Sequence, residues 1–357
     1  MDQYIISGIQ QVGVGVADVA QASKWYRRSF GLDTPLFDDE GRPVHMVRYT
    51  GGVLQSRRAI LAISLRGGGG FEIWQYTSRV PAAPGFVPGV GDLGILWPRI
   101  KALDVERARQ ALAATDARLV GELTRDPTGC RHFFVCDPWG NCFEVAESES
   151  WFAPRAGRRG TWTGGAAGCA IGVSSAERAL VLYRDVLGYD RVLSDTSGVF
   201  EDFAALPGGG KRVRRIILTH SKERGGPFSR LLGRSTVELV EPLMGFGRQI
   251  FAGRYWGDLG FIHLCFDVRG MDGFKTECRE RGFPFTVDSA DSFDMGEAAG
   301  RFGYVEDQDG TLLELVETHR IPIAKKLGWY VNLARRPSHK ALPWLLVRAL
   351  GLARVRD

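Results

Sequence analysis

Two side chains that could bind a metal ion lie in apolar segments near the end of the chain. His263 begins the stretch HLCFDV, and Glu314 lies 51 residues later in TLLELVE. Alternation of apolar and polar residues predicts a strand in each case. Imidazole and carboxylate groups are common ligands of divalent cations. If the two strands share a sheet, both side chains can face one site, so the rest of the sequence is interpreted around this pair.

The elements that must position this pair recur along the chain. WYRRSFGLD at 25–33 returns as LYRDVLGYD at 182–190, and DPWGNCFEVAE at 137–147 returns as DQDGTLLELVE at 307–317. Each half divides once more into a strand, an amphipathic helix and further strands. We therefore predict an α+β chain of four β-α-β-β-β modules.

The repeats and composition shifts define four segments. We expect modules one and two in residues 1–150, a linker in 151–163, modules three and four in 164–320, and a basic C-terminal extension in 321–357.

The fourfold pattern, with V-x-D before a helix and D-x-x-G before a final strand that contains Glu, resembles the vicinal oxygen chelate superfamily. This superfamily includes glyoxalase I, extradiol dioxygenases, and fosfomycin and bleomycin resistance proteins. The resemblance covers about 320 residues and implies two cupped mixed sheets, each built from two modules. It also implies one ligand from the first strand and one from the last strand of each module. Function varies widely on one fold, so it must be argued from the site.

The ligand positions depend on how the modules pair. The first-strand positions are Gln11, Trp97, Gly168 and His263, and the last-strand positions are Glu72, Glu144, Glu238 and Glu314. If adjacent modules pair, as in extradiol dioxygenases, Trp97 blocks one site and the other has three ligands. If modules one and four pair, as in four-module fused glyoxalases, Gln11, Glu72, His263 and Glu314 meet in one site. We predict the second pairing because it gathers every plausible ligand.

Two carboxylates, an imidazole and an amide oxygen suit a six-coordinate divalent cation and leave two positions open. The resemblance to glyoxalase I implies one such ion (Zn, Ni, Co, Mn or Fe), with Glu314 as the catalytic base and Glu72 as its counterpart on the other face. We expect a metal-dependent lyase or isomerase of glyoxalase type. It would act through a metal-chelated enediolate on a small or medium organic substrate with vicinal oxygens.

Several alternatives stay open. Gln11 could be an amide on the pocket wall. An Fe(II) ring-cleaving dioxygenase is less favoured because such sites use two His and one carboxylate. A small-molecule-binding or resistance protein would need no metal. Glu144 and Glu238 are expected to be hydrogen-bonded relics of a second site.

Other segments carry weaker signals. His132 and His220 are expected to be structural or pocket-lining. The segment Val287–Arg301 is either a mobile lid or a solvated connection. The six cysteines form no C-x-x-C pair, so we expect reduced, buried thiols.

Composition limits the partners. A chain of 44% hydrophobic and 24% charged residues is an ordinary globular balance. With neither a signal-peptide pattern nor a long apolar run, we expect a cytoplasmic protein with a small-molecule substrate. From Arg320 onward there are nine Lys or Arg and one acid, so the preceding 319 residues carry 37 basic and 40 acidic groups. This balance of −3 argues against a nucleic-acid partner.

The basic extension combines Trp329, Tyr330 and Trp344 with an interrupted leucine stripe after Pro343. Such a segment could lie on an anionic membrane surface. We favour packing against the body of the protein, because Pro337 and Pro343 interrupt the segment.

Overall fold

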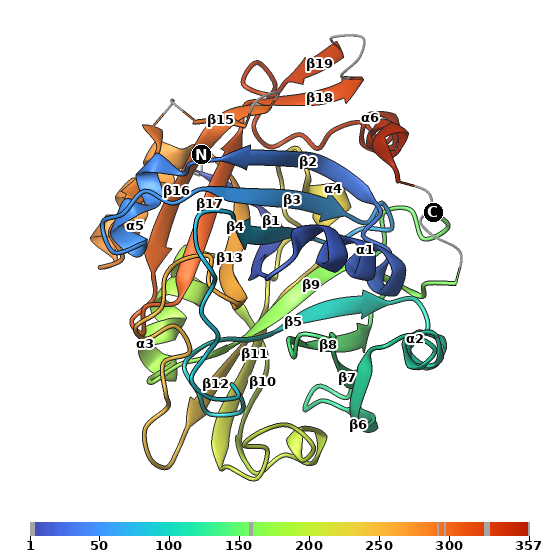
Figure 1. Cartoon of the computed structure of the whole chain (residues 1–357), viewed down its shortest axis with the longest axis vertical. Coiled ribbons are helices and arrows are strands. Elements are labelled where there is room, and N and C mark those ends of the chain that lie inside the picture. The colour runs from blue at the N-terminus through green and yellow to red at the C-terminus, as the bar shows by residue number, and fades with distance from the viewer. Residues whose placement is uncertain (1–3, 157–159, 291–292, 296–297, 325–328, 356–357) are drawn as a thin grey trace.

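The computed structural model describes residues 4–156, 160–290, 293–295, 298–324 and 329–355. Two large curved sheets dominate it, with the module helices packed against them (Figure 1). The first sheet contains β1 (Ile5–Gly15), β2 (Thr34–Gly41), β3 (Arg57–Ile63), β4 (Gly70–Tyr76), β13 (Gly260–Arg269), β14 (Val287–Asp288), β15 (Phe293–Met295), β16 (Ala298–Glu306) and β17 (Leu312–Thr318). The second contains β5 (Gly94–Ala102), β6 (Arg118–Arg125), β7 (Arg131–Cys136), β8 (Cys142–Glu147), β9 (Thr163–Gly172), β10 (Arg191–Gly198), β11 (Val213–Thr219) and β12 (Thr236–Pro242).

Each module has one helix after its first strand. These helices are α1 (Val19–Phe30), α2 (Val105–Ala113), α3 (Ala176–Leu180) with the π-helical turn η2 (Val181–Val186), and α5 (Met271–Glu280). Short helices lie in the connections, namely η1 (Val44–Tyr49), η3 (Glu201–Phe203) and α4 (Ser229–Leu232).

The strand order shows how the modules pair. The first sheet runs β14-β16-β17-β13-β1-β4-β3-β2, with β15 paired to β16, and the second runs β10-β11-β12-β9-β5-β8-β7-β6. At the centre of the first sheet, β1 of module one is antiparallel to β13 of module four. At the centre of the second, β5 of module two is antiparallel to β9 of module three. The predicted α+β fold and the pairing of modules one and four are confirmed.

The repeated sequence motifs have clear local roles. Asp18 caps α1 and Asp104 caps α2, because each side chain accepts a hydrogen bond from a backbone N–H in the first turn. In the D-x-x-G turns, Asp137 accepts from the backbone of Trp139, and Asp307 accepts from that of Asp309. These bonds close the tight turns before the last strands.

Two of these motifs also contact each other. Tyr26 donates a 2.7 Å hydrogen bond to Asp137, and Tyr183 donates a 3.0 Å bond to Asp307. The helix of the first module in each half is therefore fixed to the turn of the second module in the same half. This contact explains why the Tyr and Asp segments recur together in the sequence.

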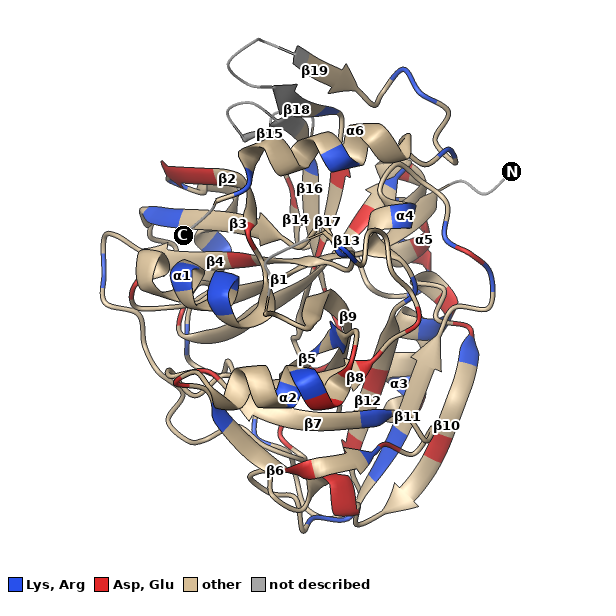
Figure 2. Ribbon diagram, turned by 90° about the vertical axis from the view of Figure 1, so that its right-hand side faces the viewer, with Lys and Arg blue, Asp and Glu red and all other residues tan. Residues whose placement is uncertain are grey.

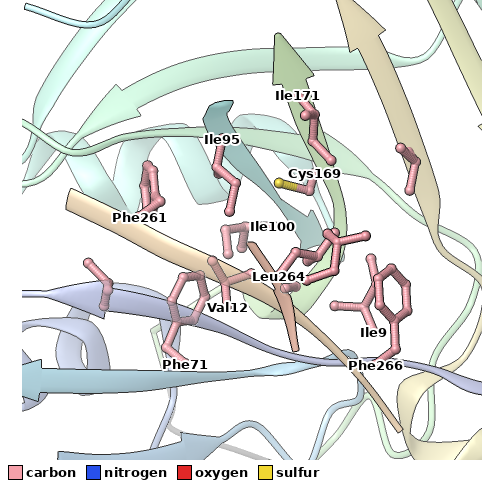
Figure 3. Packing of buried hydrophobic residues seen from close by; sticks show 14 of the residues in the cluster. Ile9, Val12, Phe71, Ile95, Ile100, Cys169, Ile171, Phe261, Leu264 and Phe266 are labelled. Carbon is pink, nitrogen blue, oxygen red and sulfur yellow. The ribbon is translucent and has the colours of Figure 1, made fainter. Parts of the chain in front are cut away.

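The main hydrophobic core lies between the two sheets. Val12, Phe71 and Leu264 of the first sheet face Ile100 and Ile171 of the second (Figure 3). Because successive side chains of a strand point to opposite faces, the other faces carry separate clusters. Trp74, Trp256 and Tyr304 belong to the cluster on the first sheet. This face of the first sheet holds the candidate site.

The described part of the C-terminal extension packs on the body. It contains β18 (Arg320–Ala324), β19 (Trp329–Asn332), α6 (Trp344–Ala349) and η6 (Leu350–Ala353). Leu333, Val347 and Leu350 join Leu65 of the first half in one cluster. Arg354 lies 2.7 Å from a carboxylate oxygen of Asp33. Packing is thus observed, whereas contact with a membrane surface stays a prediction.

Acidic and basic residues are interspersed over the two sheets (Figure 2). Within the described ranges, the helices are all too short or too polar to cross a membrane.

The segment Val287–Arg301, expected to be a mobile lid or a solvated connection, contains paired strands. Val287 pairs with Tyr304, and Phe293 pairs with Gly300, both antiparallel. Positions 291–292 and 296–297 lie outside the described residues. The described residues of the segment form paired strands at the sheet edge.

One cysteine prediction is wrong. Cys136 and Cys142 form a disulfide, while Cys130, Cys169, Cys265 and Cys278 are free. The paired cysteines lie directly opposite one another on β7 and β8, with Cα atoms 3.9 Å apart. The tight D-P-W-G turn between them sets this register. The spacing C-D-P-W-G-N-C was the signal that sequence analysis missed.

Candidate metal centre

The candidate site is built where four strands of the first sheet lie side by side. β4 runs parallel to β1 and places Glu72 beside Gly13. β17 runs parallel to β13 and places Glu314 beside Cys265. Across the central antiparallel pair, Gly13 lies opposite His263. The two first strands and the two last strands of modules one and four thus converge.

Glycine at position 13 leaves room for the imidazole. A Cβ atom at this position would lie 2.5 Å from Cε1 of His263, which is closer than a side chain allows. His263 can therefore lie over β1 and reach both carboxylates, which come from the strands that flank the β1–β13 pair on the same face of the sheet.

The structure brings all four predicted residues together. Nε2 of His263 lies 3.1 Å from Oε2 of Glu314 and 3.3 Å from Oε2 of Glu72. Nε2 of Gln11 donates to the same two oxygens, at 3.0 Å for Glu72 and 3.1 Å for Glu314. The ligand atoms of Glu72, His263 and Glu314 all lie within 4.8 Å of one another. The four residues are buried, with at most 9% of any one exposed.

Aromatic side chains enclose the imidazole. The ring of Trp256 lies nearly parallel to that of His263, with centroids 6.4 Å apart. The Tyr304 hydroxyl lies 3.4 Å from Nδ1 of His263. Trp74 packs edge-on against Trp256. The neighbours Trp74, Trp256 and Tyr304 therefore limit access of water to the site.

Sequence analysis did not identify these neighbours. Trp74 and Cys265 could have been found, since each lies two residues after a predicted ligand and thus on the same face of its strand. Cys265 is buried and contacts Oε1 of Gln10 through its sulfur, at 3.3 Å. Trp256 lies in an irregular segment before β13, where no periodic pattern marks it.

The electrostatics of the site favour a positive charge at its centre. Burial lowers the pKa of His263, but the charges and hydrogen bonds of Glu314 and Glu72 raise it by a larger amount. The resulting pKa is about 10. Burial raises the pKa of Glu314, but the charge of His263 lowers it more, so that it lies below its usual value. An imidazolium therefore neutralises part of the carboxylate charge.

The donor set fits a divalent cation. Two buried carboxylates that converge on one point need a compensating charge, which a divalent ion supplies better than one imidazolium. Oxygen and imidazole nitrogen donors suit first-row transition metals. Gln11 can present its amide oxygen by rotation of the terminal amide. Gln11, Glu72, His263 and Glu314 are thus the residues that would hold the ion.

The equivalent positions of the second sheet contain no such set. Trp97 lies two residues before the partner of Glu144 on β5, just as His263 lies two residues before the partner of Glu314 on β13. Two arginines bind the carboxylates instead. Arg99 binds Glu144 through two hydrogen bonds of 2.9 and 2.7 Å, and Arg215 donates a 2.6 Å bond to Glu238. The prediction that Glu144 and Glu238 are hydrogen-bonded is confirmed, and their origin in a second site stays a prediction.

His132 belongs to the same network. Its Nδ1 lies 2.8 Å from Glu144, and its Nε2 lies 3.4 Å from Asp202. Asp202 in turn accepts two hydrogen bonds from Arg215. Sequence analysis expected a structural or pocket-lining role for His132, and the contacts are those of a structural residue.

Comparisons with known proteins agree with this architecture. Residues 8–145 match the family model of the Glyoxalase/Bleomycin resistance protein/Dioxygenase superfamily. Glyoxalase I from Zea mays has a TM-score of 0.52 and 14% identity, over 87% of this chain and 92% of that chain. A putative dioxygenase from Bacillus subtilis subsp. subtilis str. 168 has a TM-score of 0.55 and 12% identity, over 88% and 86%. No curated protein matches the sequence.

Cupped sheets of β-α-β-β-β modules, with acidic residues on their last strands, define a duplicated chelate fold. Residues 8–145 match the model of this superfamily, and most of the chain shares its fold with the glyoxalase I and dioxygenase structures. At these identities the likeness to solved structures shows the fold alone.

Proposed function

We propose that the protein is a divalent-metal-dependent lyase or isomerase of glyoxalase type. The observation that carries this proposal is the convergence of Glu72, His263 and Glu314 within 4.8 Å in a buried part of the first sheet. Glyoxalase I from Zea mays shares the fold, though not at an identity that transfers its activity. A bound divalent ion would supply Lewis-acid polarisation of two neighbouring substrate oxygens.

The carboxylates are placed to move a proton. Glu72 and Glu314 reach the centre from β4 and β17, which lie on opposite sides of the β1–β13 pair. A substrate held between them presents one carbon to each carboxylate. Glu314 would remove a proton from one carbon, and return of the proton to the neighbouring carbon would complete an isomerisation. Glu72 is the counterpart on the other face.

The surrounding side chains would bind and shield the substrate. The indole N–H groups of Trp74 and Trp256 are buried and have no hydrogen-bond partner among the described residues. A buried donor without a partner is costly, and a substrate oxygen would satisfy it. Both indoles and Tyr304 also fill much of this face, which favours a small or medium substrate.

A ring-cleaving dioxygenase is the second candidate. One solved structure with this fold is titled a putative dioxygenase. Non-haem Fe(II) oxygenases commonly use two His and one carboxylate, whereas this site offers one His and two carboxylates. The donor set therefore favours proton transfer over oxygen activation.

Metal analysis and a reaction screen test the proposal. Protein purified without chelators should contain about one divalent ion per chain. In D₂O, a panel of α-hydroxyketones and hemithioacetals should show metal-dependent exchange of the proton next to the carbonyl. Oxygen consumption with catechols would instead support the dioxygenase. Absence of metal even after supplementation would overturn the proposal.

A further inference from the structure

A cavity of about 730 Å³ lies in the second sheet, apart from the candidate metal centre. Its walls come from the ends of β8, β9 and β12, residues 147–150 and the connection at 220–235. None of Gln11, Glu72, His263 and Glu314 is among its described lining residues. Its volume is that of a typical small-molecule site.

The cavity carries an excess of positive charge. Its lining includes five basic residues, Arg99, Lys101, Arg224, Arg230 and Arg234, and three acidic residues, Glu147, Glu149 and Glu223. The difference of five and three is +2. Arg99 is already neutralised by Glu144, and Glu147 pairs with Arg131 outside the cavity. Without Arg99 and Glu147, the lining still has four basic and two acidic residues, so the excess of positive charge stays at +2.

Lys101 is an unusual lining residue because only 1% of it is exposed. Its ammonium donates a 2.6 Å hydrogen bond to the carbonyl of Ser150 and faces the Trp151 ring at 5.2 Å. Among the described residues, no carboxylate lies within ion-pair distance of it. Burial accordingly lowers the pKa of Lys101 to about 8. A buried cation without a counter-charge is costly, and a bound anion would compensate it.

His220 provides a second unsatisfied group in the same cavity. It is 4% exposed, and its Nδ1 lies 2.7 Å from the carbonyl oxygen of Lys222. This contact makes Nδ1 the donor, so Nε2 is an acceptor, and it has no partner among the described residues. Burial lowers the pKa of His220, which keeps the ring neutral. A hydroxyl group on a ligand would satisfy Nε2 of His220 by donating a hydrogen bond to it.

We propose that this cavity binds a small organic anion that carries a hydroxyl group. Arg230, Arg234 and Lys101 attract the carboxylate groups, and Nε2 of His220 accepts a hydrogen bond from the ligand hydroxyl. The site is independent of metal binding at the first sheet. The second pair of modules would thus have a ligand site of its own, although its carboxylates Glu144 and Glu238 are neutralised by arginines.

Calorimetric titration with two matched probes tests the proposal. Citrate carries a hydroxyl, and tricarballylate is the same tricarboxylate without it. Citrate should bind the full chain, and tricarballylate should bind about 5-fold to 10-fold more weakly, as the loss of one hydrogen bond to a buried group implies. A His220→Phe variant should reduce citrate affinity to that of tricarballylate. Equal affinity of the wild type for both probes would overturn the hydroxyl contact.

Charge variants locate the site. Arg230→Gln with Arg234→Gln removes two exposed side chains of the cavity and should weaken citrate binding by about 10-fold or more. Arg178→Gln removes one exposed charge elsewhere and should change it by less than about twofold. His263→Ala should leave citrate affinity unchanged. Absence of citrate binding at millimolar concentration, or binding lost in His263→Ala but not in the double variant, would overturn the proposal.

Discussion

Gln11 donates a 3.1 Å hydrogen bond to Glu314 across 303 residues of sequence. The bond joins the first strand of module one to the last strand of module four. Neither half of the chain therefore contains the candidate centre by itself.

Replacing His263 by Ala should abolish binding of a divalent metal. The imidazole is the only nitrogen donor among Glu72, His263 and Glu314. Its loss should lower metal affinity by more than the roughly 10–100-fold that follows when a residue that only orients a ligand is changed. Elemental analysis of purified protein measures the bound ion. His45→Ala, a change at an exposed histidine, is the control and should keep the metal. Retention of metal in His263→Ala would remove this residue from the set of ligands.

Glu314→Gln should keep the metal but lower turnover by about 10²–10⁴-fold. An amide oxygen can still coordinate an ion, but it cannot accept the proton as a carboxylate does. Turnover on the substrate found by the screen and metal content should be measured on the same sample. Glu280→Gln, at an exposed position of α5, should match the wild type. Unchanged turnover in Glu314→Gln would assign the base to another residue.

Arg215→Met should destabilise the protein by about 3–5 kcal/mol, because it removes the ion-pair partner of the buried Glu238 and one of the two partners of Asp202. Arg215 is fully buried and binds both Asp202 and Glu238. Urea unfolding at pH 7 measures the loss. The adjacent Arg214 pairs with exposed acids, so Arg214→Gln should cost less than about 1 kcal/mol. Equal effects of the two changes would mean that the buried network is not required for stability.

The network around His132 should make stability fall at alkaline pH. Burial lowers the pKa of His132, but its contacts with Asp202 and Glu144 raise it by a larger amount. The resulting pKa is about 9. Because the pKa is higher in the folded protein, the imidazolium contributes its full stabilisation below about pH 6.5, the pKa of an unfolded His. This stabilisation is lost as pH rises through about 9. We expect a loss on the order of 3 kcal/mol over this window. Urea unfolding between pH 6 and 9.5 should show a weaker pH dependence in His132→Gln than in the wild type. Identical slopes would contradict a charged His132.

Thiol titration should distinguish the paired cysteines. The chain has six cysteines, of which the structure leaves four free. Under denaturing conditions without reductant, four equivalents of a thiol reagent should react, and six should react after reduction. Cys136→Ser with Cys142→Ser should give four in both conditions. Six reactive thiols in the unreduced wild type would contradict the disulfide.

Much of the fold could be predicted from the sequence because the repeats encode local contacts. The Tyr and Asp motifs recur because Tyr26 binds Asp137 and Tyr183 binds Asp307. The pairing of modules one and four followed from the residue types at the ligand positions, since only that pairing gathers His263 with Gln11 and both glutamates.

Other features depend on contacts that no local pattern marks. Arg215 lies in the apolar strand β11, and only the tertiary structure shows that it neutralises Glu238 and Asp202. Trp256 reaches the centre from an irregular segment. The cavity around Lys101 combines strand ends from several modules with a connecting loop, so it has no signature in any one repeat.

The central pairing of β1 with β13 also sets the order of events during synthesis. Gln10 contacts Cys265, 255 residues further along the chain, which ribosomes reach on the order of tens of seconds later at ~5–20 residues per second. Until then, one edge of β1 has no partner from its own sheet and could pair wrongly with β5 or β9. We expect yield from rapid expression at high temperature to suffer at this stage, and holdase chaperones or slower translation to raise the fraction of soluble protein.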